Sequence, residues 1–106
     1  MIFKENSGKF NVIMNTKSRV KLIIKGHVQG VFFRVEAKNK ADALGLAGWV
    51  TNTDGGHVEA IVEGDTDKIK EFVQWCSIGP DGAEVDEFEF RFEKYAGEFH
   101  DFQVRM

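Results

Sequence analysis

The chain passes from a strand pattern to a helix pattern across Gly26-His27-Val28-Gln29-Gly30-Val31-Phe32-Phe33-Arg34. Two glycines can take positive φ values that strain other residues, so successive N–H groups of the loop can point into one concavity. Unpaired amides at the start of the following helix attract an anion, and the guanidinium of Arg34 can hold an oxyanion in a bidentate way. The segment therefore predicts an anion-binding loop, although glycines at a strand end are as often plain turn residues.

The patterns around this loop predict a strand before it and a helix and a hairpin after it. Residues 19–25 alternate between apolar and polar side chains, which is typical of a half-buried strand. Phe33, Ala37, Ala41 and Leu44 recur at helical spacing and predict an amphipathic helix that ends near Gly45. Strands are expected over residues 47–53 and 57–63, joined by a tight turn rich in glycine, so these two strands should be antiparallel neighbours.

The second half of the chain predicts another helix and two more strands. Residues 64–66 begin the helix, with Asp65 or Thr66 as its cap, and its apolar stripe is formed by Ile69, Phe72, Val73 and Cys76. Residues 79–82 end it. Phenylalanines at positions 88, 90 and 92 alternate with charged residues and predict a strand with an aromatic face. Val85 has the opposite parity, which predicts a β-bulge or a change of strand before Phe88, and a short strand is expected from Phe102 onward.

This element order specifies the fold class. Strand, helix, strand, strand, helix, strand is the order of an α+β, ferredoxin-like βαββαβ sandwich. Both helices should cover one face of a mostly antiparallel sheet, with a short extra C-terminal strand. Core packing is the better interpretation of the phenylalanine row, because its outward neighbours are largely acidic. The alternative is an RNA-binding sheet that stacks bases on exposed aromatic residues.

Length and composition limit the class of protein. The 106 residues fit one domain, and a net charge of −3 argues against non-specific binding to nucleic acid or an acidic membrane. A single cysteine excludes an internal disulfide framework and suits a reducing cytoplasm. No apolar run has the length of a membrane span or a signal peptide. Residues 1–18 are expected to form a polar, flexible extension to a domain over residues 19–106, and Met14 is a candidate natural start.

A second segment places Asn52 near the end of a strand, just before the glycine turn, within Gly48-Trp49-Val50-Thr51-Asn52-Thr53-Asp54-Gly55-Gly56-His57-Val58. Taken alone, this asparagine is a turn-forming residue. Together the two segments match the patterns G-x-V-Q-G-V-x-F-R and G-W-V-x-N-x-x-x-G-x-V, which resemble the acylphosphatase family from about residue 20 to residue 106. Members of that family hydrolyse the mixed anhydride of a carboxylate and phosphate.

The resemblance implies roles for particular residues. Arg34 corresponds to the substrate-binding arginine and Asn52 to the asparagine that orients the attacking water. Thr53 and Gly56 would shape the rim of the site, whereas Phe33 and Trp49 are expected in the core beside it. The phosphate cradle corresponds to Gly26, His27, Val28, Gln29, Gly30, Val31 and Phe32.

The implied reaction is in-line attack of water on phosphorus, without a metal ion or cofactor. The carboxylate leaving group is already good, which fits the absence of a recognisable nucleophile or metal-binding motif in the sequence. No general base is identifiable, so the proton is expected to go to the substrate's own phosphate. The partner is then a small acyl phosphate and the protein a cytoplasmic monomer. The alternative is an anion-binding module of the same fold without turnover, which would have little use for Asn52.

Overall fold

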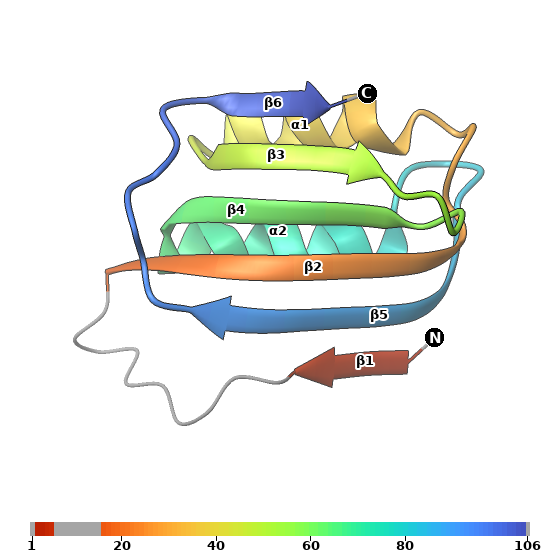
Figure 1. The fold of residues 1–106 in the computed structure, drawn as a ribbon, viewed down its shortest axis with the longest axis horizontal. Coiled ribbons are helices and arrows are strands. Elements are labelled where there is room, and N and C mark those ends of the chain that lie inside the picture. The colour runs from red at the N-terminus through yellow and green to blue at the C-terminus, as the bar shows by residue number, and fades with distance from the viewer. Residues whose placement is uncertain (1, 6–15, 106) are drawn as a thin grey trace.

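The computed structural model describes residues 2–5 and 16–105, which form a six-stranded sheet covered on one face by two helices (Figure 1). The strand order is β1-β5-β2-β4-β3-β6. The inner pairs β2–β5, β2–β4 and β3–β4 are antiparallel, and the edge pairs β1–β5 and β3–β6 are parallel. The elements are β1 (Ile2–Glu5), β2 (Lys17–His27), α1 (Phe33–Ala43), β3 (Ala47–Asn52), β4 (Val58–Asp65), α2 (Thr66–Ile78), β5 (Glu84–Glu93) and β6 (Phe102–Arg105).

This topology confirms the predicted ferredoxin-like sandwich with its additional C-terminal strand. Strand β1 was not predicted, and it lies at the edge of the sheet beside β5. Neither helix, nor any other in the described part of the chain, is long and apolar enough to cross a membrane.

The start of the packed domain differs from the expected position at residue 19. Strand β2 already begins at Lys17, and Ser18 is buried with its hydroxyl oxygen 2.7 Å from Oγ1 of Thr66. The difference arises because Ser18, although polar, finds a hydrogen-bond partner at the start of α2. Residues 6–15, including Met14, lie outside the described residues, so the expected flexibility and start site stay predictions.

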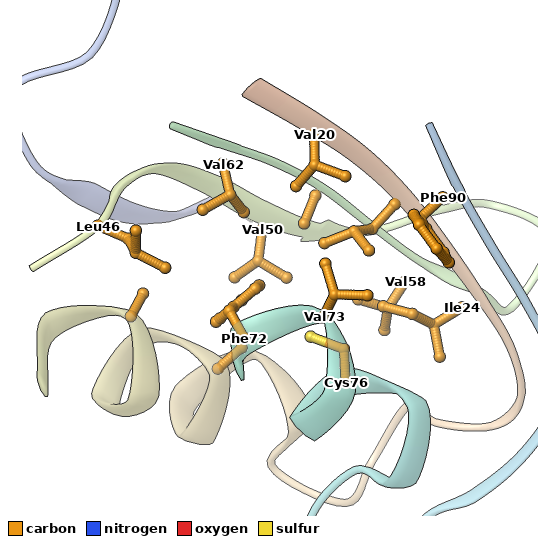
Figure 2. Packing of buried hydrophobic residues seen from close by; sticks show 14 of the residues in the cluster. Val20, Ile24, Leu46, Val50, Val58, Val62, Phe72, Val73, Cys76 and Phe90 are labelled. Atoms are coloured by element: carbon orange, nitrogen blue, oxygen red, sulfur yellow. The ribbon is translucent and has the colours of Figure 1, made fainter. Parts of the chain in front are cut away.

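The hydrophobic core lies between the sheet and the helices, and Figure 2 shows part of it. Alternate residues of β2 point toward the helices and are fully buried, as the period-two pattern predicts. Phe88 and Phe90 on β5 are also buried, which confirms that this row packs in the core. The predicted stripe of α2 meets these strands, with the residues Ile69, Phe72, Val73 and Cys76 all buried.

A bulge interrupts the pairing of β2 with β5 near the end of β2. Lys25 pairs with Glu87 but Gly26 pairs with Val85, so Asp86 is the additional residue of β5. The predicted bulge is therefore confirmed. Gly26 has φ 131°, and a Cβ there would collide with the carbonyl oxygen of Glu84. The close approach of the two strands requires glycine at this position.

The crossover from β5 to β6 is held at the opposite end of the sheet by the buried carboxylate of Glu63. It accepts hydrogen bonds from the backbone N–H groups of Ala96, Gly97 and Glu98, at 2.9, 3.2 and 2.8 Å, and from Nη1 of Arg19 at 3.2 Å. Desolvation by burial acts to raise the pKa of Glu63, but the backbone amides and Arg19 outweigh it and the pKa is lowered. The bonds fix the connection that leads the chain across the sheet to β6.

Candidate active site

The two sequence motifs meet at one end of the sheet. Strand β2 ends there and leads into α1, and the parallel strands β3 and β6 also end there (Figure 1). Asn52 is the last residue of β3, and Arg34 is the second residue of α1. The connection between β2 and α1 therefore lies next to the hairpin that follows Asn52.

The loop itself is shorter than the predicted cradle. Gly26 and His27 belong to β2 and pair with β5, so the connecting loop comprises residues 28–32. The strand continues because the bulge in β5 keeps the two strands in register as far as Glu84. His27 is exposed, whereas Val28 is buried and contributes its side chain to the core.

The sign of φ alternates toward the end of the loop. Gly30 has φ 77° and Phe32 has φ 62°, while Val31 between them has no positive φ. Alternation of left- and right-handed residues turns successive N–H groups toward the same side. Phe32 also caps α1, whose first backbone bond runs from the N–H of Glu36 to the carbonyl of Phe32. The amides at the start of α1 thus point toward the same end of the molecule as the loop.

Gln29 ties this loop to the hairpin between β3 and β4. Its Nε2 donates to the carbonyl oxygens of Thr53 and His57, each at 2.9 Å. Those two residues are also joined by a backbone bond from the N–H of Thr53 to the carbonyl of His57 at 2.9 Å. A single side chain therefore fixes the position of the loop relative to the residue that follows Asn52.

Arg34 is oriented by Arg105, the last residue of β6. Its Nη1 donates to the carbonyl oxygen of Arg105 at 3.1 Å, and Oγ1 of Thr51 donates to the same oxygen at 3.3 Å. The guanidinium carbon of Arg105 lies 4.6 Å from the ring centroid of Trp49. Trp49 is half-buried on the helix-free face of the sheet, so its predicted place in the core is wrong, whereas Phe33 is buried as expected. The alternation of β3 buries Val50 and turns Trp49 to the other face.

Asn52 is half-exposed at the end of β3, where its backbone pairs with Val58. Within the described part of the chain its side-chain amide has no hydrogen-bond partner, so both its donor and its acceptor are available to water. Two hydrogen bonds to Thr53 hold the turn after it. The carbonyl of Thr53 accepts from the N–H of Gly56 at 3.1 Å, and its Oγ1 accepts from the N–H of His57 at 3.2 Å. Both rim residues expected from the sequence thus belong to one hydrogen-bonded turn.

Thr51 and Arg105 contribute to the geometry of the site but were not predicted. Their contribution depends on parallel pairing between β3 and β6, which a sequence pattern does not specify. Among the described residues, His, Cys, Asp and Glu form no group of three or more that could hold a metal ion.

The acylphosphatase family model matches residues 20–104. The chain belongs to the acylphosphatase family. A relative called acylphosphatase, from Pyrobaculum arsenaticum, is 47% identical over 82% of this chain and 93% of its own length. Two solved acylphosphatase structures are similar in fold. The one from Coxiella burnetii has a TM-score of 0.80 at 34% identity, covering 85% of this chain and 94% of its own. The one from Bacillus subtilis has a TM-score of 0.81 at 31% identity, covering 84% and 99%.

Membership of the acylphosphatase family identifies the kind of enzyme. The chain is a hydrolase that acts on acid anhydrides, and both family and fold support the hydrolysis of acyl phosphates. The expected family resemblance and the enzyme class are thereby confirmed.

Proposed function

We propose that this acylphosphatase hydrolyses small acyl phosphates by in-line attack of water on phosphorus. The residues in the loop 28–32 and Arg34 bind the phosphoryl oxygens, and Asn52 orients the water. The observation that carries the proposal is the bidentate contact of Gln29 with the hairpin after Asn52, at 2.9 Å to each carbonyl. It supports a single site built from both motifs, because it fixes the loop and the asparagine relative to each other.

The loop stabilises negative charge on the phosphoryl group. Charge develops on the three non-bridging phosphoryl oxygens, and preorganised N–H donors stabilise it without reorganising during the reaction. The alternating φ values at residues 30–32 support this use of the loop. Gly26 and His27 are less suited to phosphate binding, since their backbone is paired with β5. We therefore assign phosphate contact to Val28, Gln29, Gly30, Val31 and Phe32, together with Arg34.

Arg34 supplies the charge and the geometry. The carbonyl of Arg105 accepts a hydrogen bond from one guanidinium nitrogen and orients the group, whose planar fork of N–H donors matches the geometry of an oxyanion. Because the guanidinium is held before the substrate arrives, less side-chain entropy is lost on binding. A lysine at this position has no such fork.

Asn52 orients the attacking water molecule. A neutral amide can accept one hydrogen bond from a water molecule and also donate to it, which limits the directions from which the water oxygen approaches phosphorus. In the proposed step the water oxygen forms a bond to phosphorus as the bond from phosphorus to the acyl oxygen breaks. The carboxylate departs with that electron pair. The proton of the water passes to a phosphate oxygen, and inorganic phosphate is released.

The test is hydrolysis of benzoyl phosphate by the purified protein in the presence of a chelator. Wild type should turn over, whereas Asn52→Ala should lose most of its kcat. Asn39→Ala, an exposed asparagine on α1, is the matched control and should behave as wild type. If folded wild type does not turn over but phosphate still raises its Tm, the protein is an anion-binding module and the proposal is wrong.

Two further properties belong to the same proposal. We place the enzyme in the cytoplasm, because a single free cysteine, Cys76, suits a reducing compartment. We also propose that it acts as a monomer, since the contacts of Gln29 and Arg34 that hold the proposed site together lie within one chain. Sedimentation equilibrium at the concentration used for the assay tests the second property.

A further inference from the structure

A groove of about 430 Å³ opens beside the phosphate loop, on the helical side of the molecule. It lies between the start of α1 and the segment that follows α2, and Figure 1 shows these two connections at the same end of the fold. Its volume lies within the range of small-molecule sites, about 300–1,000 Å³. The residues that line it, besides Gly79, are Val31, Phe32, Glu36, Trp75, Pro80 and Asp81.

The walls of the groove are held by close packing. Trp75 packs edge-to-face against the buried ring of Phe33, with centroids 5.4 Å apart. Gly79 approaches the same ring so closely that a Cβ would lie 2.9 Å from it, and a Cβ on Gly82 would lie 3.8 Å from Val31. The segment after α2 therefore packs closely against Phe33 at the start of α1 and passes beside Val31 of the loop, which gives the groove defined walls.

Phe32 is the strongest sign that the groove receives a ligand. Its side chain is 75% exposed, and among the described residues it is the one non-glycine with positive φ. A left-handed conformation is costly for a bulky residue, and an exposed aromatic ring forgoes the free energy of burial. A ligand that covers the ring would recover the free energy of burial. Because Phe32 also belongs to the phosphate loop, such a ligand would lie next to a bound phosphate.

The charges of the groove are all negative. Glu36 and Asp81 are the ionisable residues that line it, and both are exposed. In the neighbouring proposed phosphate site, Arg34 carries the positive charge. A ligand that spans the two regions would therefore carry its negative charge at one end only, with an uncharged or cationic apolar group at the other.

We propose that this groove is the subsite for the acyl group of the substrate. It favours flat, uncharged acyl groups, which pack against Phe32 and Trp75, and the carboxylates of Glu36 and Asp81 disfavour acyl groups with a second negative charge. This inference rests on the proposed acyl phosphate hydrolysis, and it adds the class of acyl group to it. Val31 and Phe32 belong to both regions, whereas Glu36, Trp75 and Asp81 belong to the groove alone, so changes at these three residues separate binding of the acyl group from binding of phosphate.

The test compares kcat/KM for acetyl, benzoyl and succinyl phosphate, which carry a small, an aromatic and a carboxylated acyl group. Wild type should prefer benzoyl phosphate and discriminate against succinyl phosphate. Asp81→Asn should raise the succinyl-to-benzoyl ratio about twofold and Asp81→Lys about fivefold, as expected for exposed charges. Glu36→Gln should act in the same direction. Asp67→Asn and Glu71→Gln, which lie on α2 outside the groove, are the matched controls.

A second variant tests the aromatic contact. Phe32→Ala should lower the benzoyl-to-acetyl ratio of kcat/KM about fivefold. Any disturbance of the phosphate loop lowers both values together, so the ratio reports contact with the ring. If folded wild type hydrolyses none of the three substrates, the proposed function fails and the subsite with it. If all three are hydrolysed and neither ratio changes in the variants, the subsite is wrong and the proposed function stands.

Discussion

The side-chain amide of Gln29 joins the two halves of the candidate active site, with Nε2 at 2.9 Å from the carbonyl oxygen of Thr53. Its second bond, to the carbonyl of His57, closes a bidentate contact with the hairpin. The proposed phosphate loop, residues 28–32, and the proposed water-binding Asn52 lie on different elements, so the proposed catalysis depends on their relative position. Displacement of reacting groups by about 1 Å can cost about 10²-fold in rate.

Gln29→Glu should disrupt this contact, because a carboxylate cannot donate to the two carbonyl oxygens and is repelled by them. We expect kcat/KM for benzoyl phosphate to fall at least about tenfold, and the free energy of unfolding to fall by about 1–3 kcal/mol. Kinetic assays and urea unfolding measure the two effects. Gln74→Glu makes the same charge change at an exposed position of α2 and should have neither effect. Normal turnover by folded Gln29→Glu would refute the positional role.

Arg34→Lys should lower kcat/KM on the order of 10²-fold, because an ammonium keeps the charge but loses the planar fork. Phosphate should also become a weaker competitive inhibitor. Arg91→Lys, on the helix-free face of β5, is the control for the same exchange. A lysine variant with nearly normal kcat/KM would show that bidentate binding is not needed.

Asn52→Ala should separate catalysis from binding. If the amide orients water and does not touch phosphate, kcat should fall on the order of 10²–10³-fold while the inhibition constant of phosphate stays near the wild-type value. Steady-state kinetics with phosphate as inhibitor measure both. A parallel loss of phosphate affinity would instead make Asn52 part of the phosphate-binding site.

Much of the fold could be predicted because its periodic patterns are strong. The row of phenylalanines in β5 has one buried face, and the parity of Val85 correctly indicated the bulge. The start of β2 was missed because Ser18 is polar and is buried through a tertiary hydrogen bond to Thr66. Strand β1 pairs across a long interval of sequence with β5, and such an interval leaves no local pattern.

The site was predicted less completely than the fold. The sequence motifs named the loop and Asn52, but they did not indicate that Gly26 and His27 continue strand β2. That result depends on the additional residue of the bulge, which extends the pairing as far as Glu84. The contact between Arg34 and the Arg105 carbonyl depends on where β6 joins the sheet.

Glu63→Gln should destabilise the fold in a manner that depends on pH. The pKa of Glu63 is lowered from its ordinary value of 4.5, so the carboxylate contributes its full stability above that pH. This contribution is lost as the pH falls through the lower pKa of the folded state. We expect the variant to lose about 2 kcal/mol at pH 7, and the difference from wild type to shrink below pH 4.5.

Urea unfolding of wild type and Glu63→Gln between pH 7 and the acid limit of folding measures this difference. Glu59→Gln is the control. Glu59 lies on the same strand and the same face as Glu63, but it is not among the carboxylates that Arg19 contacts, which are those of Glu63, Glu93 and Glu98. A difference between wild type and Glu63→Gln that does not change with pH would contradict the assignment of the lowered pKa.

The position of an oxygen label tests most directly whether the enzyme directs water onto phosphorus. Benzoyl phosphate is hydrolysed in ¹⁸O-labelled water with chelator present, under conditions where the uncatalysed reaction is negligible, and both products are analysed by mass spectrometry. Attack on phosphorus places the label in inorganic phosphate and leaves benzoate unlabelled. Label in benzoate would mean that water attacks the acyl carbon, and the proposed roles of the loop, Arg34 and Asn52 would be wrong.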